Sequence, residues 1–278
     1  MARSAVEEHI LNEAKKQRRK IAIGIWRPDN EEIVRTLREA QAYADITIVG
    51  SKIDGFECIP TADDDEASQV IVDLVVSGKV DGFVRAQLKD SYTHKVYVEK
   101  TGLTNTAKIT PGVIAKDDFC FAVSNPSNYA SLNVADQKME AERTAQYLRE
   151  ELGIEPLIGV MSTRRPTGRV GEFPLLEQIA ANCEETAQYL RDKGYDVTEY
   201  YIEYERAVWE KRNMLVPAIG MICNTWFKAL VYLGGWHIVT CPFLDQGAYY
   251  DDAPRNNTAW FWPIVSTVAW INRCSIKK

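Results

Sequence analysis

Short apolar runs rich in β-branched residues recur along the chain, and segments with helical periodicity separate them. The runs have the length of buried strands and are bounded by polar residues. We predict strands at residues 21–25, 46–49, 80–84, 119–123, 157–161, 197–202, 214–216 and 238–241. Because strands and helices alternate, the pattern indicates an α/β fold with mainly parallel sheets and crossover helices.

Residues that start or stop helices support this order. Asp29 can cap a helix that runs through Leu37, and Asn224 can open a later one. Gly153 and Gly194 can end helices, because glycine readily adopts the left-handed conformation found there. Together these signals predict helices over residues 29–37, 136–153, 174–194 and 224–234, with an aromatic helix at the end of the chain.

The alternation pauses twice, and we place the domain crossings at these pauses. The first lies at residues 108–116, around Pro111 and Gly112, and the second near Pro242, after which no strand pattern returns. A length of 278 residues suits two domains or one large α/β body. We therefore expect one domain of residues 1–112 with 243–278, and a second of residues 113–242.

Composition excludes several classes of protein. The chain is 46% hydrophobic and 26% charged, which is typical of globular proteins, and its apolar runs are too short to span a membrane. Its net charge of -6 argues against nucleic acid as a partner. The first twenty residues lack the pattern of a signal peptide, so we expect a cytoplasmic protein.

Cysteine and histidine give little sign of chemistry. The 6 cysteines form no CxxC motif, and the 3 histidines are far apart in the sequence. We therefore expect no metal site and no histidine-based triad. Cys223 and Cys241 lie in apolar surroundings, which favours a packing role over that of a nucleophile.

Ligands of open parallel sheets bind beyond the carboxyl ends of the strands, so the residues that follow each strand are the candidates. Arg27 follows the first predicted strand, and the third is followed by Arg85, Gln87 and Lys89. The segment STRRPTGRVGE after residues 157–161 combines hydroxyls, arginines and glycines ahead of a helix. Its candidates are Ser162, Thr163, Arg164, Arg165 and Arg169.

Hydroxyls, backbone amides and arginines at a helix start are typical of a site for phosphate or carboxylate. Alternatively, the arginines pair with Glu172 or with acids of a neighbouring helix. The segment lacks GxxxxGK[ST], and no GxGxxG follows the first strand, so neither ATP nor NAD is favoured.

The segment 215–257 contains a strand, a turn, G-x-x-x-N, a helix ending in L-G-G, a further strand, a proline, and an acidic loop with Arg255. This order resembles the phosphate acetyltransferase and butyryltransferase superfamily. The narrower resemblance is to the methanogenesis marker protein 4 group, also named putative methyltransferase Mtx subunit X. It includes VGSKIDG (49–55), GKVDGFVR (78–85) and GIEPLIGVMS (153–162) and covers most of the chain.

The resemblance implies a two-domain α/β/α sandwich of the isocitrate and isopropylmalate dehydrogenase kind, a site in the interdomain cleft, and a homodimer. The acyltransferases carry D-x-S-R in the acidic loop, followed by a catalytic aspartate. Here Pro254 stands at the serine, Arg255 matches the arginine, and an aromatic run near Phe261 takes the place of the aspartate. Acyl transfer between phosphate and CoA therefore lacks its hydroxyl and base. Arg255 could hold an anion, or pair with Asp251 or Asp252.

We expect a transferase or transferase subunit of methanogenic metabolism, which binds a small anionic substrate through Arg164, Arg165 and Arg255. The resemblance implies methyl transfer with a methyl-carrying coenzyme and a partner subunit, or acyl transfer with a CoA-like molecule. Asn224 or Ser162 would hydrogen-bond the reacting group, and no residue stands out as the acid or base. A non-catalytic binding or assembly protein is the alternative.

Overall fold

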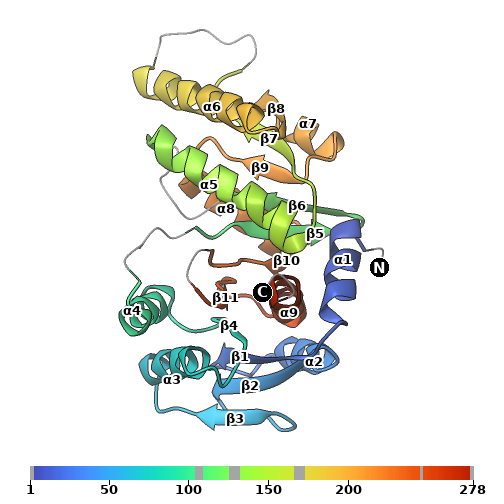
Figure 1. Ribbon diagram of the computed structural model, residues 1–278, viewed down its shortest axis with the longest axis vertical. Helices are drawn as coiled ribbons and strands as arrows, with labels where there is room; N and C mark the ends of the chain where they lie inside the picture. The colour runs from blue at the N-terminus through green and yellow to red at the C-terminus, as the bar shows by residue number, and fades with distance from the viewer. Residues whose placement is uncertain (1–2, 104–108, 125–131, 166–172, 245–246, 276–278) are drawn as a thin grey trace. The chain divides into compact units, whose positions relative to one another are not determined.

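The computed structural model describes residues 3–103, 109–124, 132–165, 173–244 and 247–275. Its contacts divide the chain into two compact units (Figure 1). Unit 1 consists of Met1–Ala5 and Ile109–His237, and unit 2 of Val6–Lys108 and Ile238–Lys278. The domain boundaries expected from the sequence stay a prediction, because a division by contacts does not establish which segments fold independently.

Unit 2 contains a parallel sheet in the strand order β11-β4-β1-β2-β3. Its strands are β1 (Arg19–Ile25), β2 (Ala44–Gly50), β3 (Glu57–Pro60), β4 (Gly82–Val84) and β11 (Tyr249–Asp251). The helices are α1 (Ala5–Ala14), which starts at the unit boundary, α2 (Glu31–Ala40), α3 (Asp64–Val76), α4 (Asp90–Thr101) and α9 (Phe261–Ser275). In Figure 1, α3 and α4 lie on one side of this sheet, and α2 and α9 lie on the other.

Side chains alternate between the two faces of this sheet, as the pleat of a strand requires. Ala22 of β1 and Phe83 of β4 belong to a buried cluster that includes residues of α3 and α4. Ile21, Ile23 and Ile25 of β1 are fully buried as well. Both faces of the sheet are therefore covered, which explains why its central strands are continuous apolar runs.

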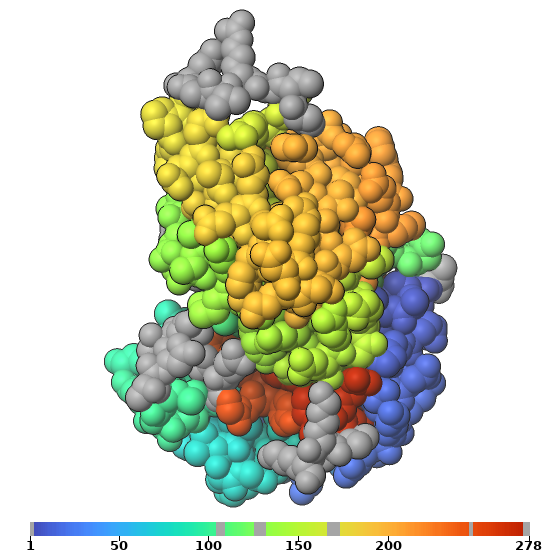
Figure 2. Space-filling view, turned by 45° about the horizontal axis from the view of Figure 1, so that its top comes forward, coloured from blue at the N-terminus to red at the C-terminus, as the bar shows by residue number. Residues whose placement is uncertain are grey.

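Unit 1 contains strands in the order β5-β6-β9-β7-β8, parallel except for the antiparallel pair β5 and β6. They are β5 (Gly112–Lys116), β6 (Phe119–Val123), β7 (Leu157–Met161), β8 (Asp196–Tyr201) and β9 (Met214–Val216). The helices are α5 (Val134–Gln146), extended by a π-helical turn Tyr147–Leu152, α6 (Pro174–Asp192), α7 (Tyr204–Trp209) and α8 (Gly220–Tyr232). Figures 1 and 2 show α5 and α6 side by side. In β10 (His237–Thr240) the chain passes back to unit 2.

The predicted α/β class with mainly parallel sheets is confirmed, and each predicted strand is present. Gly153 and Gly194 have φ angles of 75° and 83°, as expected for residues that follow a helix. The described residues form no helix that is long and apolar enough to cross a membrane.

Four details differ from the sequence prediction. Asn30 rather than Asp29 caps α2, because the Asn30 side chain accepts a hydrogen bond from the Glu32 amide at 2.9 Å. Asn224 does not open a helix, since α8 already begins at Gly220. The pause at residues 108–116 contains β5, and a strand, β11, does follow Pro242.

Candidate functional site

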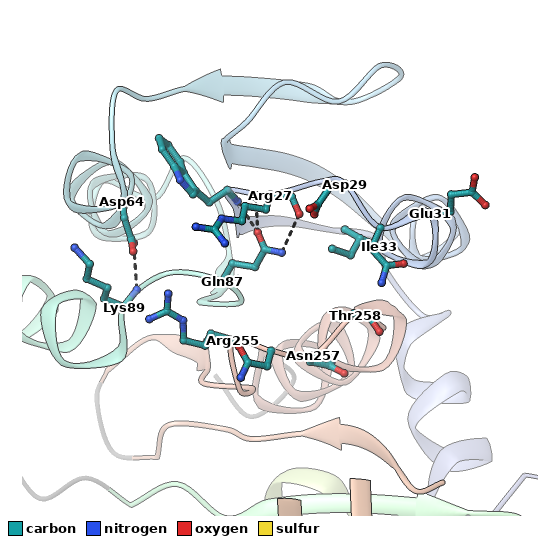
Figure 3. Close-up of a pocket in the computed structure, with 13 residues that line it drawn as sticks. Arg27, Asp29, Glu31, Ile33, Asp64, Gln87, Lys89, Arg255, Asn257 and Thr258 are labelled. Carbon is teal, nitrogen blue, oxygen red and sulfur yellow. Dashed lines mark hydrogen bonds between the residues drawn. The ribbon is translucent and has the colours of Figure 1, made fainter. Parts of the chain in front are cut away.

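A pocket of about 920 Å³ opens in unit 2 beyond the carboxyl ends of β1, β4 and β11. These strands end near one another, because Val84 at the end of β4 pairs with Asp251 at the end of β11 and with Ile23, two residues before the end of β1. The loops that follow the three strands line the pocket together with the first turn of α2 (Figure 3). This is the place where ligands of open parallel sheets bind.

Each of the three loops contributes one cation to the pocket, namely Arg27, Lys89 and Arg255. In Figure 3 their charged ends lie at the same end of the pocket. Arg27 and Arg255 are exposed, and neither makes an ion pair with the part of the chain that the structure describes. Lys89 donates to Asp65 at 2.8 Å, and this hydrogen bond raises the pKa of Lys89. The two arginines are therefore available to an anion.

Acidic and aromatic groups complete the wall of the pocket. Asp29 and Glu31 flank Asn30, the cap of α2, and Trp26 precedes Arg27. Asp64 accepts a hydrogen bond from the Lys89 amide at 3.1 Å, so that carboxylate fixes the loop after β4. The three cations thus gather at one end of the pocket, where Asp64 lies beside Lys89, and Asp29 and Glu31 line the rest (Figure 3). Among the described residues, no group of three His, Cys, Asp or Glu side chains could hold a metal ion.

Arg85 does not line this pocket, although the sequence predicts it as a ligand residue. Its side chain is buried and forms an ion pair with Asp252. Nη1 donates to the carbonyls of Ala86 and Leu88, and Nη2 donates to those of Asp252 and Ala253. Binding of a ligand by Arg85 would therefore require it to leave these partners, which makes it a structural cation in this fold.

The acids near Arg255 are engaged elsewhere. The carboxylate of Asp252 pairs with Arg85 and accepts from the Tyr250 hydroxyl at 3.0 Å. Asp251 is fully buried and accepts from the Thr240 hydroxyl at 2.6 Å and from two main-chain amides. The alternative that Arg255 pairs with Asp251 or Asp252 is therefore wrong. Burial raises the pKa of Asp251 to about 6, and its hydrogen bonds oppose this change.

The other predicted arginines belong to unit 1. Arg164 donates to Glu177 at 2.6 Å and to Glu184 at 2.8 Å, both on α6. This is the pairing with acids of a neighbouring helix that the sequence left open. Arg165 is exposed, and Arg169 lies outside the described residues.

The predicted hydroxyl and amide groups are also in unit 1. Ser162 accepts a weak hydrogen bond from the Arg164 amide at 3.4 Å, and the Thr163 hydroxyl donates to the Leu176 carbonyl at 2.8 Å. Asn224 is half-buried inside α8. Neighbouring Cys223 is buried, and burial raises the pKa of its thiol well above the usual value, which opposes a role as a nucleophile.

The sequence pointed to Gln87 and Lys89 as residues after the third strand, but the site prediction chose Arg85 of that segment. The position of each residue relative to the strand and to the next helix distinguishes the buried Arg85 from the pocket residues Gln87 and Lys89. Arg85 continues the strand directly, whereas Lys89 precedes α4 and is exposed. Gln87 lies between the buried residues Ala86 and Leu88 and reaches the main chain of the loop after β1.

Comparison with known proteins gives one group of relatives and one fold. No family model matches the chain. The chain is 28% identical over 258 residues to a protein of Methanosarcina mazei named "Putative methyltransferase mtx subunit X", with 90% of each protein covered.

Two solved structures are similar along nearly the whole chain. A phosphotransacetylase from Streptococcus pyogenes has a TM-score of 0.65 at 13% identity, with 99% of both chains covered. The EutD phosphotransacetylase from Staphylococcus aureus has a TM-score of 0.63 at 15% identity, with 97% of this chain and 98% of that chain covered. At this identity the likeness shows the fold alone. The resemblance found in the sequence is confirmed: the chain is a relative of the proteins named methyltransferase mtx subunit X, and it has the phosphotransacetylase fold.

Proposed function

We propose that this chain is a methyltransferase subunit of methanogenic metabolism, and that the pocket of unit 2 binds an anionic group of a small molecule. The observation that carries the binding proposal is the convergence of Arg27, Lys89 and Arg255 from three strand ends. The methyltransferase part rests on the name of the relatives, which come from methane-producing archaea.

Phosphate or carboxylate is the expected group. A guanidinium presents parallel N–H donors that match the oxygens of either anion, and Arg27 and Arg255 approach from separate loops. A volume of about 920 Å³ also accommodates a molecule much larger than the anion itself. The cations would then orient the bound molecule, and catalysis would depend on positioning and charge stabilisation.

Acyl transfer is the second candidate, because the fold is that of phosphotransacetylases. It is disfavoured by Pro254, which has no hydroxyl at the position where the acyltransferases carry serine. The same observation favours a third candidate, a binding protein without a reaction of its own. All three share the anion pocket, so the binding test comes first.

The test is the thermal stability of the chain with inorganic phosphate, acetyl phosphate or CoA, followed by calorimetric titration. A ligand present at 100 times its Kd stabilises the folded state by about 2.7 kcal/mol. Arg27→Ala and Arg255→Ala should each weaken binding about tenfold or more, because each removes a charged hydrogen-bond donor. Arg38→Ala is the matched control, since Arg38 is an exposed arginine of α2 outside this pocket. Unchanged affinity in both pocket variants would refute the site.

A ligand that stabilises the chain is then tested for turnover with candidate methyl and acyl donors. Transfer of a methyl group supports the first candidate, transfer of an acyl group the second, and binding without turnover the third. The part of the site predicted in unit 1, namely Ser162, Thr163, Arg164, Arg165, Arg169 and Asn224, stays a prediction. Arg165→Ala examines it most directly, because Arg165 is exposed.

We also propose that the chain forms a homodimer through the outer face of α8. Ile222 is 61% exposed and Leu233, which follows the helix, is 88% exposed, while Lys228 is the single charged residue of α8. Such a face can pack against its own copy, as in a twofold interface. Light scattering should give twice the mass of the chain, and Ile222→Glu should give the monomer. Val76→Glu, at an exposed apolar residue of α3, is the control.

A further inference from the structure

The side chain of Gln87 reaches from the loop after β4 to the main chain that carries Arg27. Its Oε1 accepts hydrogen bonds from the amides of Trp26 at 2.8 Å and Arg27 at 2.6 Å. Its Nε2 donates to the Arg27 carbonyl at 3.1 Å (Figure 3). One amide side chain thus satisfies three main-chain groups of two consecutive residues.

Gln87 is itself held in place. Its main-chain amide donates to the Gly24 carbonyl at 3.0 Å, and its neighbours Ala86 and Leu88 are fully buried. Ala86 has a φ angle of 52°, a left-handed conformation that residues other than glycine rarely adopt. Such a conformation persists when the surrounding contacts fix it, so the chain that leads from the end of β4 to Gln87 is itself fixed.

The loop that Gln87 holds would otherwise have few restraints. Arg27 is exposed, and its side chain makes no ion pair within the described ranges of the chain. Besides Gln87, the hydroxyl of Ser51 binds this loop, donating to the Trp26 carbonyl at 2.7 Å. The direction in which Arg27 leaves the main chain therefore depends on the hydrogen bonds of Gln87.

We propose that Gln87 is a positioning residue, which acts on the bound anion by fixing the main chain of Trp26 and Arg27 so that the Arg27 guanidinium is held at the pocket. This rests on the proposed function, in which Arg27 binds the anion. Gln87 acts through Arg27 in this proposal, so its contribution to binding should disappear when Arg27 is removed.

The first measurement is amide hydrogen exchange of the full chain without ligand. Gln87→Met keeps the length of the side chain but removes its hydrogen bonds, so the amides of Trp26 and Arg27 should exchange about tenfold faster or more. Gln87→Glu keeps an acceptor oxygen for both amides but loses the donor to the Arg27 carbonyl, so their protection should fall less than in Gln87→Met. Gln41→Met is the control, because Gln41 also donates to a main-chain carbonyl, that of Gly55, outside the pocket. Unchanged exchange in Gln87→Met overturns the proposal.

The second measurement is a double-mutant cycle with inorganic phosphate as the probe. Gln87→Met should weaken phosphate binding about tenfold in the native chain and less than twofold in the Arg27→Ala background. An equal loss in both backgrounds means that Gln87 acts independently of Arg27 and overturns the positioning role. Unchanged affinity in Gln87→Met, with weaker binding in Arg27→Ala, overturns it as well.

The two measurements also separate this inference from the proposed function. If Gln87→Met loosens the two amides but the native chain binds no phosphate, the anion site fails and the positioning role fails with it. If the anion binds and depends on Arg27, yet the amides are unaffected, only the role of Gln87 fails.

Discussion

Replacing Arg85 by methionine should destabilise unit 2 by about 4 kcal/mol, because it leaves a buried carboxylate without its cation. The side chains of Arg85 and Asp252 are only 5% and 8% exposed. Arg85 also donates to the Leu88 carbonyl at 2.6 Å and to the Ala253 carbonyl at 3.2 Å. Both carbonyls would lose this hydrogen-bond donor, which further lowers the free energy of unfolding.

The partner substitution Asp252→Leu should cost a similar amount, about 3–5 kcal/mol, because it leaves the guanidinium of Arg85 buried without its carboxylate. Combining the two changes removes both charges. The loss in the double variant should then be smaller than the sum of the single losses by about 3 kcal/mol. It should not vanish, because the carbonyls that Arg85 serves remain without that donor.

Urea unfolding followed by circular dichroism measures these free energies, and hydrogen exchange in β4 and β11 assigns the change to unit 2. Arg35→Met is the control: Arg35 pairs with Glu32 and Glu39 on the exposed face of α2, so its loss should cost less than about 1 kcal/mol. If Arg85→Met costs as little as the control, or if the losses of the pair are additive, Arg85 is not the structural cation inferred here. Its predicted role as a ligand residue would then regain support.

Three further predictions concern stability. Burial raises the pKa of Asp251 from 3.8 to about 6, so its contribution to stability is complete below pH 3.8 and is lost as the pH rises through 6. The unfolding free energy of the native chain, relative to that of Asp251→Asn, should therefore fall by about 2 kcal/mol from pH 4 to pH 7, and a constant difference would contradict this. Gly24→Ala should destabilise unit 2 by about 1–3 kcal/mol in urea unfolding. The new Cβ would lie 2.4 Å from Leu88 Cγ and 2.7 Å from the Arg85 carbonyl oxygen, which is too close for either atom. A variant as stable as the native chain would show that the loop after β4 can move aside. Arg164→Ala should cost less than about 1 kcal/mol in the same assay, since its ion pairs with Glu177 and Glu184 are partly exposed, and a larger loss would mean a tighter structural role.

Apart from the partly exposed strand β8, the strands that the sequence revealed are largely buried. Such strands are continuous apolar runs, and β1 and β7 are examples. The strands that it missed carry weaker signals. The residues of β3 are half-buried or exposed, β11 has 3 residues, and β5 follows a proline and begins with Gly112. Low burial therefore weakens the signal of β3, and the proline and glycine interrupt that of β5, which is itself buried.

The sequence also predicts two of the residues that line the pocket, on different grounds. Arg27 is predicted because it follows a strand, whereas Arg255 is predicted from the resemblance of its acidic loop, since β11 is not among the predicted strands. In the structure both residues follow strands that end at the same edge of one sheet, although 228 positions separate them. No local sequence pattern shows which carboxylate forms an ion pair with each arginine. Arg85 and Asp252 are separated by 167 positions, and only the pairing of β4 with β11 makes them neighbours.

Whether a cation at a strand end is neutralised depends on the charged groups that the adjacent strand supplies. Arg85 follows β4 directly, and β11 beside it supplies Asp252 at nearly the same level, so the arginine is neutralised inside the fold. Arg27 lies two residues beyond Ile25, the end of β1, and the amide of Gln87 binds the main chain of Arg27 rather than its guanidinium. An amide fixes the main chain without neutralising the guanidinium. The end of β4 thereby stabilises the loop that bears Arg255, whereas the end of β1 leaves the guanidinium of Arg27 charged and exposed for an anion.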